Sequence, residues 1–151
     1  MTHEIRCLVT DPDTAARLRA AHVSTTAVAL HGAWSAVPFE LRCFEYPDEP
    51  GAGEYDRRDV PEASLRAVTA MSAHGRFAYV QTEFWGGDGG QGAFVCEAGE
   101  LVLPPVWSVG TGPVDAALAV LGVPAPESVL HDRFDLLGLG RFRRNRDLED
   151  R

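Results

Sequence analysis

The stretch from residue 76 to residue 103 decides the expected fold, and it reads Arg-Phe-Ala-Tyr-Val-Gln-Thr-Glu-Phe-Trp-Gly-Gly-Asp-Gly-Gly-Gln-Gly-Ala-Phe-Val-Cys-Glu-Ala-Gly-Glu-Leu-Val-Leu. Aromatic and β-branched residues are typical of strands, and the glycines clustered between them are typical of turns. The predicted elements are a strand over 76–85, a Gly-rich turn over 86–90, and a hairpin of strands 91–97 and 100–103 joined by Ala98-Gly99. Consecutive strands of this kind pair as an antiparallel meander.

The flanking sequence adds further elements on both sides of this meander. The expected strands are 4–10, 25–30 and 39–46, and the three expected helices run from Asp11-Pro12 to about Ala21, from Pro61 to about His74 and from Pro113 to Leu121. A short helical piece is expected around 131–137. Pro104-Pro105 is expected to end the sheet, because proline cannot donate to a ladder. This order predicts an α+β fold, with a largely antiparallel sheet of about six strands and three helices packed mainly on one face.

Length and charge narrow the class of protein. A chain of 151 residues predicts a single domain over 1–151, with an internal acidic loop at 47–59 and a charged tail at 141–151. The 22 acidic residues outnumber the 14 basic ones, all of them arginine, and the net charge is −8. This charge argues against a generally basic nucleic-acid binder, and the apolar content of 45% argues against disorder.

Targeting signals are not indicated. No apolar run approaches the ~18 residues of a transmembrane helix, so no membrane partner is expected. The first residues, Met-Thr-His-Glu-Ile-Arg, lack the basic and apolar regions of a signal peptide. A cytoplasmic location is therefore expected.

The residue types that commonly carry chemistry form no catalytic or metal-binding pattern. Cys7, Cys43 and Cys96 lie far apart in strand-like runs, which predicts buried, reduced thiols. The five histidines are dispersed, no serine lies in a Gly-x-Ser-x-Gly elbow, and neither a metal nor a cofactor is expected. His131-Asp132 with Glu127 is a conceivable acid–base set, but such a grouping is common by chance.

The Gly-rich segment is the most distinctive feature, and it allows two interpretations. Residues 87–92 match Gly-x-Gly-x-x-Gly, but a strand-like run follows where dinucleotide binding needs a helix. One interpretation is a long hairpin loop. The other is a binding loop, because glycines let a partner approach the backbone closely. Its candidate binding residues are Glu83, Trp85, Asp88 and Gln91.

Arginines crowd the C-terminal end, at positions 141, 143, 144 and 146. The favoured interpretation is a solvated arm whose charges are neutralised by nearby acids, and pairing with the acidic loop is the alternative. Arg141 and Arg143 are added to the candidate binding residues, because arginine recognises carboxylates bidentately.

The pattern over 77–93, followed by Pro-Val-Asp-Ala-Ala-Leu at 113–118, Leu-Gly-Val at 121–123 and the ending at 134–143, resembles a group of small bacterial proteins. These carry an aromatic-Val-Glu-Thr-Glu-aromatic-aromatic-Gly-Gly strand and loop before a Gln-Ala/Gly strand. They are similar in size and style to immunity proteins of polymorphic-toxin systems, which are small, acidic, single-domain inhibitors. The resemblance covers 76–146 and implies no catalytic residue, and Gln81 stands where a Glu is expected.

The leading hypothesis is an acidic, non-enzymatic binding domain that recognises a protein partner, such as an immunity-type inhibitor facing a basic toxin domain. The alternative is a small enzyme or ligand-binding protein of a bacterial pathway. Its site would lie where the 83–92 loop meets the tail, with Glu83, Asp88 and Arg141 as polar groups. A structural or scaffolding domain is the third possibility.

Overall fold

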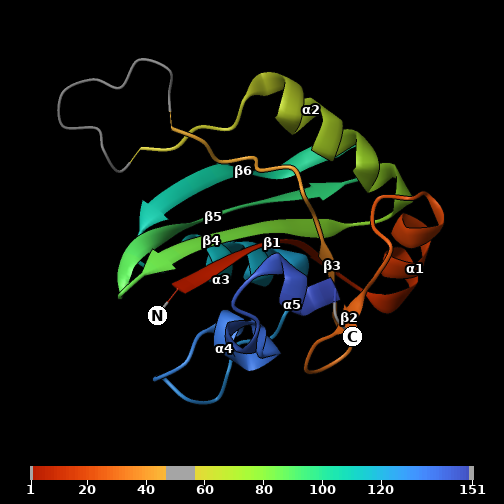
Figure 1. Ribbon diagram of the computed structural model, residues 1–151. Helices are drawn as coiled ribbons and strands as arrows, with labels where there is room; N and C mark the ends of the chain where they lie inside the picture. The colour runs from red at the N-terminus through yellow and green to blue at the C-terminus, as the bar shows by residue number, and fades with distance from the viewer. Residues whose placement is uncertain (1, 47–56, 150–151) are drawn as a thin grey trace.

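The computed structural model describes residues 2–46 and 57–149 (Figure 1). The strands are β1 (Thr2–Thr10), β2 (Val28–Ala29), β3 (Ser35–Pro38), β4 (Phe77–Trp85), β5 (Asp88–Glu97) and β6 (Glu100–Val109). The helices are α1 (Pro12–Ala20), α2 (Glu62–Met71), α3 (Pro113–Leu121), α4 (Arg133–Leu137) and α5 (Asn145–Glu149), with 3-10 turns at Ser72–His74 and Leu139–Arg141. Most of the acidic loop predicted at 47–59 lies outside the described residues.

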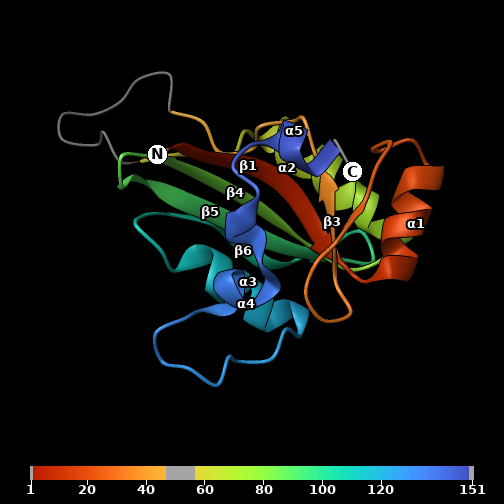
Figure 2. The same cartoon turned by 60° about the horizontal axis from the view of Figure 1, so that its bottom comes forward.

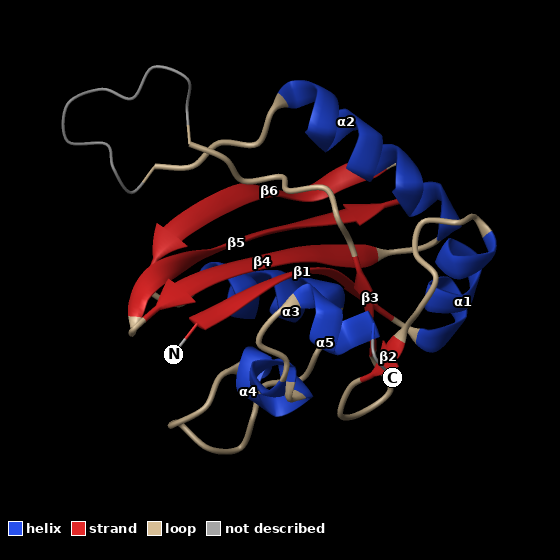
Figure 3. Cartoon of the chain, viewed as in Figure 1, coloured by secondary structure: helices blue, strands red, loops and turns tan. Residues whose placement is uncertain are grey.

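The described strands form one antiparallel sheet in the order β2-β3-β1-β4-β5-β6, as Figure 3 shows, and this confirms the predicted α+β class. β1 pairs with β4 along its whole length, from Thr2 opposite Trp85 to Thr10 opposite Phe77. The meander predicted from 76–103 forms the other half of the sheet, as β4, β5 and β6.

Both faces of the sheet are covered. Strands β1, β4 and β5 carry apolar side chains on each face, so a separate core forms on either side. One core gathers Ile5, Cys7, Val9, Ala78 and Val80 with apolar residues of α3, and this side is called the α3 face. The other core gathers Leu8, Phe77, Tyr79 and Phe94 with apolar residues of α1 and α2, and this side is called the α2 face. Two of the three longer helices thus share the α2 face, while α3 and α4 lie on the opposite side (Figure 2).

The turn of the central hairpin is shorter than the predicted 86–90. It consists of Gly86 and Gly87, whose φ angles of +60° and +91° favour glycine. The other glycines of the motif belong to β5, where Gly90 and Gly92 leave room for aromatic rings. A Cβ on Gly90 would lie 2.7 Å from the Trp107 ring, and a Cβ on Gly92 would overlap the Phe44 ring.

The strand predicted over 39–46 is wrong. On the side of β1 away from β4, the ladder partner is β3, which lies just before residues 39–46 in the chain. Residues 41–44 instead cross the α2 face, where their backbone groups bond to side chains of β4. The Cys43 amide donates to the Tyr79 hydroxyl at 3.1 Å, and the Phe44 amide donates to Gln81 Oε1 at 3.2 Å. These side chains satisfy backbone groups that burial would otherwise leave unpaired.

The expected end of the sheet at Pro104-Pro105 is also wrong, since β6 continues to Val109. β6 is the edge strand, so prolines at this position cost no ladder bond on the outer side. A register irregularity opposite Ala93 and Val95 accommodates them. The continuation matters because it places Trp107 and Val109 beside β5.

The C-terminal segment is docked on the sheet edge through the Arg143 carbonyl and the Asn145 side chain, so it is not a free arm, although the side chains of Arg143, Arg144 and Arg146 are exposed. β3 pairs with β1 only from Cys7 onward. Beyond that point the Glu4 amide donates to the Arg143 carbonyl at 2.6 Å, and the Arg6 amide donates to Asn145 Oδ1 at 2.6 Å. The tail thereby completes the edge that β3 leaves open.

All three cysteines are buried, as predicted. Burial raises the pKa of the Cys7 and Cys43 thiols to about 12 and that of Cys96 to about 11. Within residues 2–46 and 57–149, no helix is both long enough and apolar enough to cross a bilayer.

Replacing Gly92 with alanine tests the packing of aromatic rings on β5. Phe44 is buried and packed against Tyr79, Phe94 and Trp107, so its ring cannot move aside cheaply. The Gly92→Ala variant is expected to lose about 1–3 kcal/mol of unfolding free energy in urea titrations. Gly140→Ala is the control, because a Cβ there meets Phe134 at an ordinary 3.6 Å, and equal losses in both variants would contradict the packing.

His3 provides a pH test of the docked C-terminal segment. Its Nδ1 lies 2.7 Å from Thr82 Oγ1, and its ring meets Phe134 edge-on. Burial lowers the pKa of His3 below its usual 6.5, so the unfolded chain takes up this proton first as the pH falls. The contribution of His3 to the free energy of unfolding is complete above about pH 6.5 and is lost as the pH falls toward the lowered pKa of His3.

The free energy of unfolding should therefore fall less between about pH 7.5 and about pH 5.5 in His3→Gln than in the parent chain. His22→Asn, at an exposed histidine, is the control and should keep the parent slope. An unchanged slope in His3→Gln would show that His3 is not buried in its neutral form.

Candidate functional site

A chain of polar side chains runs along β4 on the α2 face, where alternate residues point to the same side. The Tyr79 hydroxyl donates to Gln81 Oε1 at 2.6 Å, and Gln81 Nε2 donates to Glu83 Oε2 at 2.9 Å. Gln81 is fully buried and Glu83 is 3% exposed. Gln81 Nε2 also donates to the Phe44 carbonyl at 3.1 Å. A glutamate at position 81 would lack both donors, which explains the glutamine found there.

Glu83 ends this chain in an ion pair with Arg58, a residue more than twenty positions earlier in the sequence. The Arg58 side chain is 6% exposed. Its guanidinium carbon lies 4.1 Å from the Tyr46 ring centroid and 4.6 Å from that of Trp107, and its Nη2 donates to the Tyr46 hydroxyl at 2.9 Å. Burying both charges is tolerated because each has several partners.

A second arginine reaches Glu83 from the other side. Arg42 Nη1 lies 3.6 Å from Glu83 Oε1, and Arg42 Nη2 donates to Glu4 Oε1 at 2.8 Å. Glu4 in turn lies 3.7 Å from Arg6. Charges of alternating sign therefore line this end of the α2 face and compensate one another.

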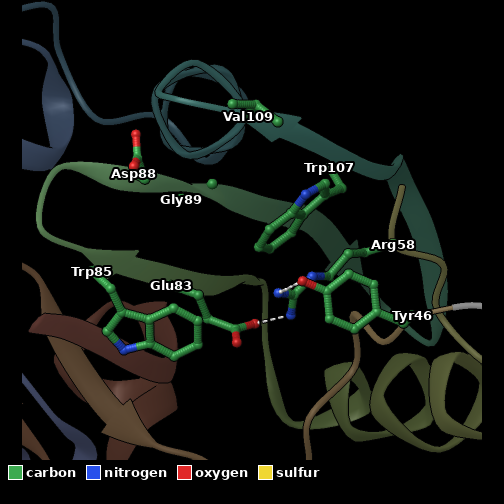
Figure 4. A pocket seen from close by; sticks show the side chains of 9 residues that line it. Tyr46, Arg58, Glu83, Trp85, Asp88, Gly89, Trp107 and Val109 are labelled. Atoms are coloured by element: carbon green, nitrogen blue, oxygen red, sulfur yellow. Dashed lines mark hydrogen bonds and ion pairs between the residues drawn. The ribbon is translucent and has the colours of Figure 1, made fainter. Parts of the chain in front are cut away.

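Beside the Arg58–Glu83 pair lies a cavity of about 320 Å³, called the slot (Figure 4). Its lining residues are Tyr46, Arg58, Glu83, Trp85, Asp88, Gly89, Gly90, Trp107 and Val109. β5 carries glycine at position 90, so no side chain rises from this position between the walls that β4 and β6 supply. Tyr46 and Arg58 close one end, and Asp88 lies at the other end.

The rim of the slot is exposed while its inner end is buried. Tyr46, Trp85 and Val109 are 59%, 54% and 56% exposed. Asp88 is exposed too, and its carboxylate forms no ion pair with any residue in the described part of the chain. An apolar aromatic rim with one uncompensated carboxylate is thus offered to solvent.

The slot brings together three of the six residues that the sequence suggested: Glu83, Trp85 and Asp88. Gln91 points to the opposite side, where its Oε1 accepts from the Val114 amide at 3.4 Å at the start of α3. Its role in the structure is to hold that helix.

Arg141 and Arg143 do not line the slot. Arg141 donates to the Ala29 carbonyl at 2.8 Å and stacks on Phe142, while the exposed Arg143 donates its backbone amide to Asp147. The tail does approach Trp85, but through Arg144 and Arg146, which line a neighbouring cavity of about 440 Å³ with it.

The residues that sequence reasoning missed are Tyr46, Arg58 and Trp107. Tyr46 and Arg58 flank the acidic loop, and an antiparallel bridge between Glu45 and Asp59 brings them together. Trp107 follows the two prolines that were expected to end the sheet. The available signal in the sequence was that Tyr46 and Arg58 lie on either side of a polar loop. No local pattern indicated that Glu83 is the partner of Arg58.

A larger cavity of about 800 Å³ lies beside α4, and its lining includes His31, Glu127, His131, Asp135 and Arg141. The acidic partner of His131 is Asp135, whose Oδ2 lies 3.6 Å from His131 Nδ1, and not Asp132, which the sequence suggested. Asp132 instead caps α4 by accepting from the Asp135 amide at 3.1 Å, and burial raises the pKa of Asp132. The charged groups here are largely exposed, whereas Arg58 and Glu83 of the slot are buried and paired with each other.

The slot is suited to binding more than to proton transfer. Glu83 Oε2 accepts from Arg58 and Gln81, and Oε1 faces Arg42, so neither oxygen is poised to take a proton from a substrate. Within the described ranges, no group of three or more His, Cys, Asp or Glu residues could hold a metal ion. Comparison with known proteins finds no matching family model, curated protein or solved structure.

Replacing Glu83 with glutamine tests the pair that closes the slot. The change keeps the shape but leaves the buried Arg58 charge without its carboxylate, so the unfolding free energy should fall by about 3–5 kcal/mol in urea titrations. The matched control is Glu62→Gln, whose exposed partner Arg66 lies 3.1 Å away. That surface pair should be worth less than about 0.5 kcal/mol. Similar losses in both variants would mean that the Glu83 charge is solvated.

Proposed function

We propose that this protein is an acidic, cytoplasmic binding protein that recognises a protein partner through the slot and its rim. The single observation that carries the proposal is the exposed aromatic rim of Tyr46 and Trp85 over a rigid, buried ion pair. Tryptophan, tyrosine and arginine are the residues that dominate binding energy at protein interfaces. Here all three types converge on one cavity.

Rigidity supports this proposal, because fixed side chains lose little conformational entropy on binding. Arg58 is held by Glu83 and stacked between Tyr46 and Trp107. A partner would therefore meet a surface that is already ordered at its centre.

Charge favours a basic partner. The net charge of −8 attracts a basic surface at long range and speeds encounter. Together with the resemblance of 76–146 to small immunity-like bacterial proteins, this supports an immunity-type inhibitor of a basic toxin domain as the specific form of the proposal.

The second candidate is a small enzyme or ligand-binding protein, favoured by one observation. The slot, at about 320 Å³, lies at the lower end of the volume range of small-molecule sites. The occupied carboxylate oxygens of Glu83 weigh against the enzyme and leave simple ligand binding as the stronger form of this candidate.

The partner test uses the purified product of the gene adjacent to the one that encodes this chain. We expect a complex by calorimetry, and we expect Trp85→Ala to weaken it at least about 30-fold, as for a hot-spot aromatic residue. Val102→Ala is the control, because Val102 is 44% exposed elsewhere on β6. It should leave the affinity within about threefold.

Two results would contradict the proposal. One is a complex that Trp85→Ala and Asp88→Ala leave unchanged, which would place the interface elsewhere. The other is saturable binding of a small molecule that competes with no protein and is lost in Trp85→Ala, which would favour the second candidate.

A further inference from the structure

The inner end of the slot already binds one arginine, Arg58. Arg58 comes from the chain itself, stacks on the rings of Tyr46 and Trp107, and pairs with Glu83. Aromatic faces attract guanidinium through their quadrupole, and the carboxylate supplies a directional charge. The slot thus combines flat aromatic walls with an acid at the end of the cavity.

The outer half of the slot repeats these elements without an occupant from the described chain. Trp85 supplies a half-exposed aromatic face, Val109 contributes to the lining, and Gly89 and Gly90 line the slot with backbone alone. Asp88 supplies the carboxylate at the open end (Figure 4).

Electrostatics decides the sign of the group that fits. The charge of Arg58 is compensated by Glu83, and Arg42 is compensated by Glu83 and Glu4. Asp88 is the one lining charge that has no ion-pair partner in the part of the chain that the structure describes. A cation that enters the outer half therefore meets an unpaired carboxylate, whereas an anion would have to displace Glu83 from Arg58.

Shape decides between the guanidinium of arginine and the ammonium of lysine. The slot is bounded by aromatic side chains and by the backbone of Gly89 and Gly90, where a planar group can lie flat. A guanidinium is planar, stacks on aromatic faces and is more weakly hydrated than an ammonium, so it loses less on entering a partly apolar cavity.

We propose that the outer half of the slot receives an arginine side chain of the partner, stacked on Trp85 and paired with Asp88. This inference rests on the proposed function and names the group that the same surface recognises. Arg58 then lies beside the incoming guanidinium as its intramolecular counterpart.

The test needs no partner protein. N-acetyl-L-argininamide is titrated into the isotope-labelled full chain, and the indole N–H of Trp85 and the amides of Gly89 and Gly90 are followed by NMR. We expect saturable shifts at these positions, and none with N-acetyl-L-citrullinamide, which has nearly the same shape without the charge. Asp88→Asn should weaken binding about threefold or more, whereas Glu100→Gln, an exposed acid at the far end of β5 and β6, should not.

Four outcomes would overturn the inference. They are the absence of shifts with argininamide, equal shifts with citrullinamide, equal weakening in Glu100→Gln, and shifts centred on residues outside the slot. If the partner complex depends on Trp85 while argininamide produces no shift there, the binding surface stands and the arginine assignment fails. If neither the partner complex nor the binding of argininamide depends on Trp85, the proposed binding surface and the arginine assignment both fail.

Discussion

The buried ion pair between Glu83 and Arg58 is the interaction on which the end of the molecule that holds the slot depends. The side chains of Glu83 and Arg58 are 3% and 6% exposed, so water solvates neither charge well. Glu83 therefore requires Arg58, and the chain around Arg58 must be held against the sheet. Gln81 and Tyr79 extend the same hydrogen-bonded chain to residues 41–44, so an otherwise irregular segment is fixed to β4 at each step.

The aromatic packing follows from this arrangement. Arg58 brings its guanidinium between Tyr46 and Trp107, and Phe44 packs over β5 against Trp107. Rings can lie this close to the strand only because Gly90 and Gly92 have no side chains. These glycines therefore serve the packing of the aromatic rings, and Gly90 also lines the slot.

Local patterns predicted what local interactions determine. The meander, the Asp11 cap of α1 and the glycine that ends α3 all depend on neighbours in sequence and were predicted correctly. The alternation of Phe39, Leu41 and Cys43 predicted a strand, but its backbone partners are side chains more than thirty residues later, which no local pattern reveals. Glu83, Trp85 and Asp88 could be proposed from the motif, whereas Arg58 could not, since its importance comes from a partner that only the fold supplies.

A double-mutant cycle on the unfolding free energy, across Glu83→Gln and Arg58→Gln, tests most directly whether the buried pair holds this end of the molecule together. The coupling energy separates the pair from the separate costs of each substitution. We predict a coupling of about 2 kcal/mol or more for Glu83 and Arg58, against less than about 0.5 kcal/mol for the exposed pair of Glu62 and Arg66. A coupling for Glu83 and Arg58 no larger than that of the exposed pair would contradict the account.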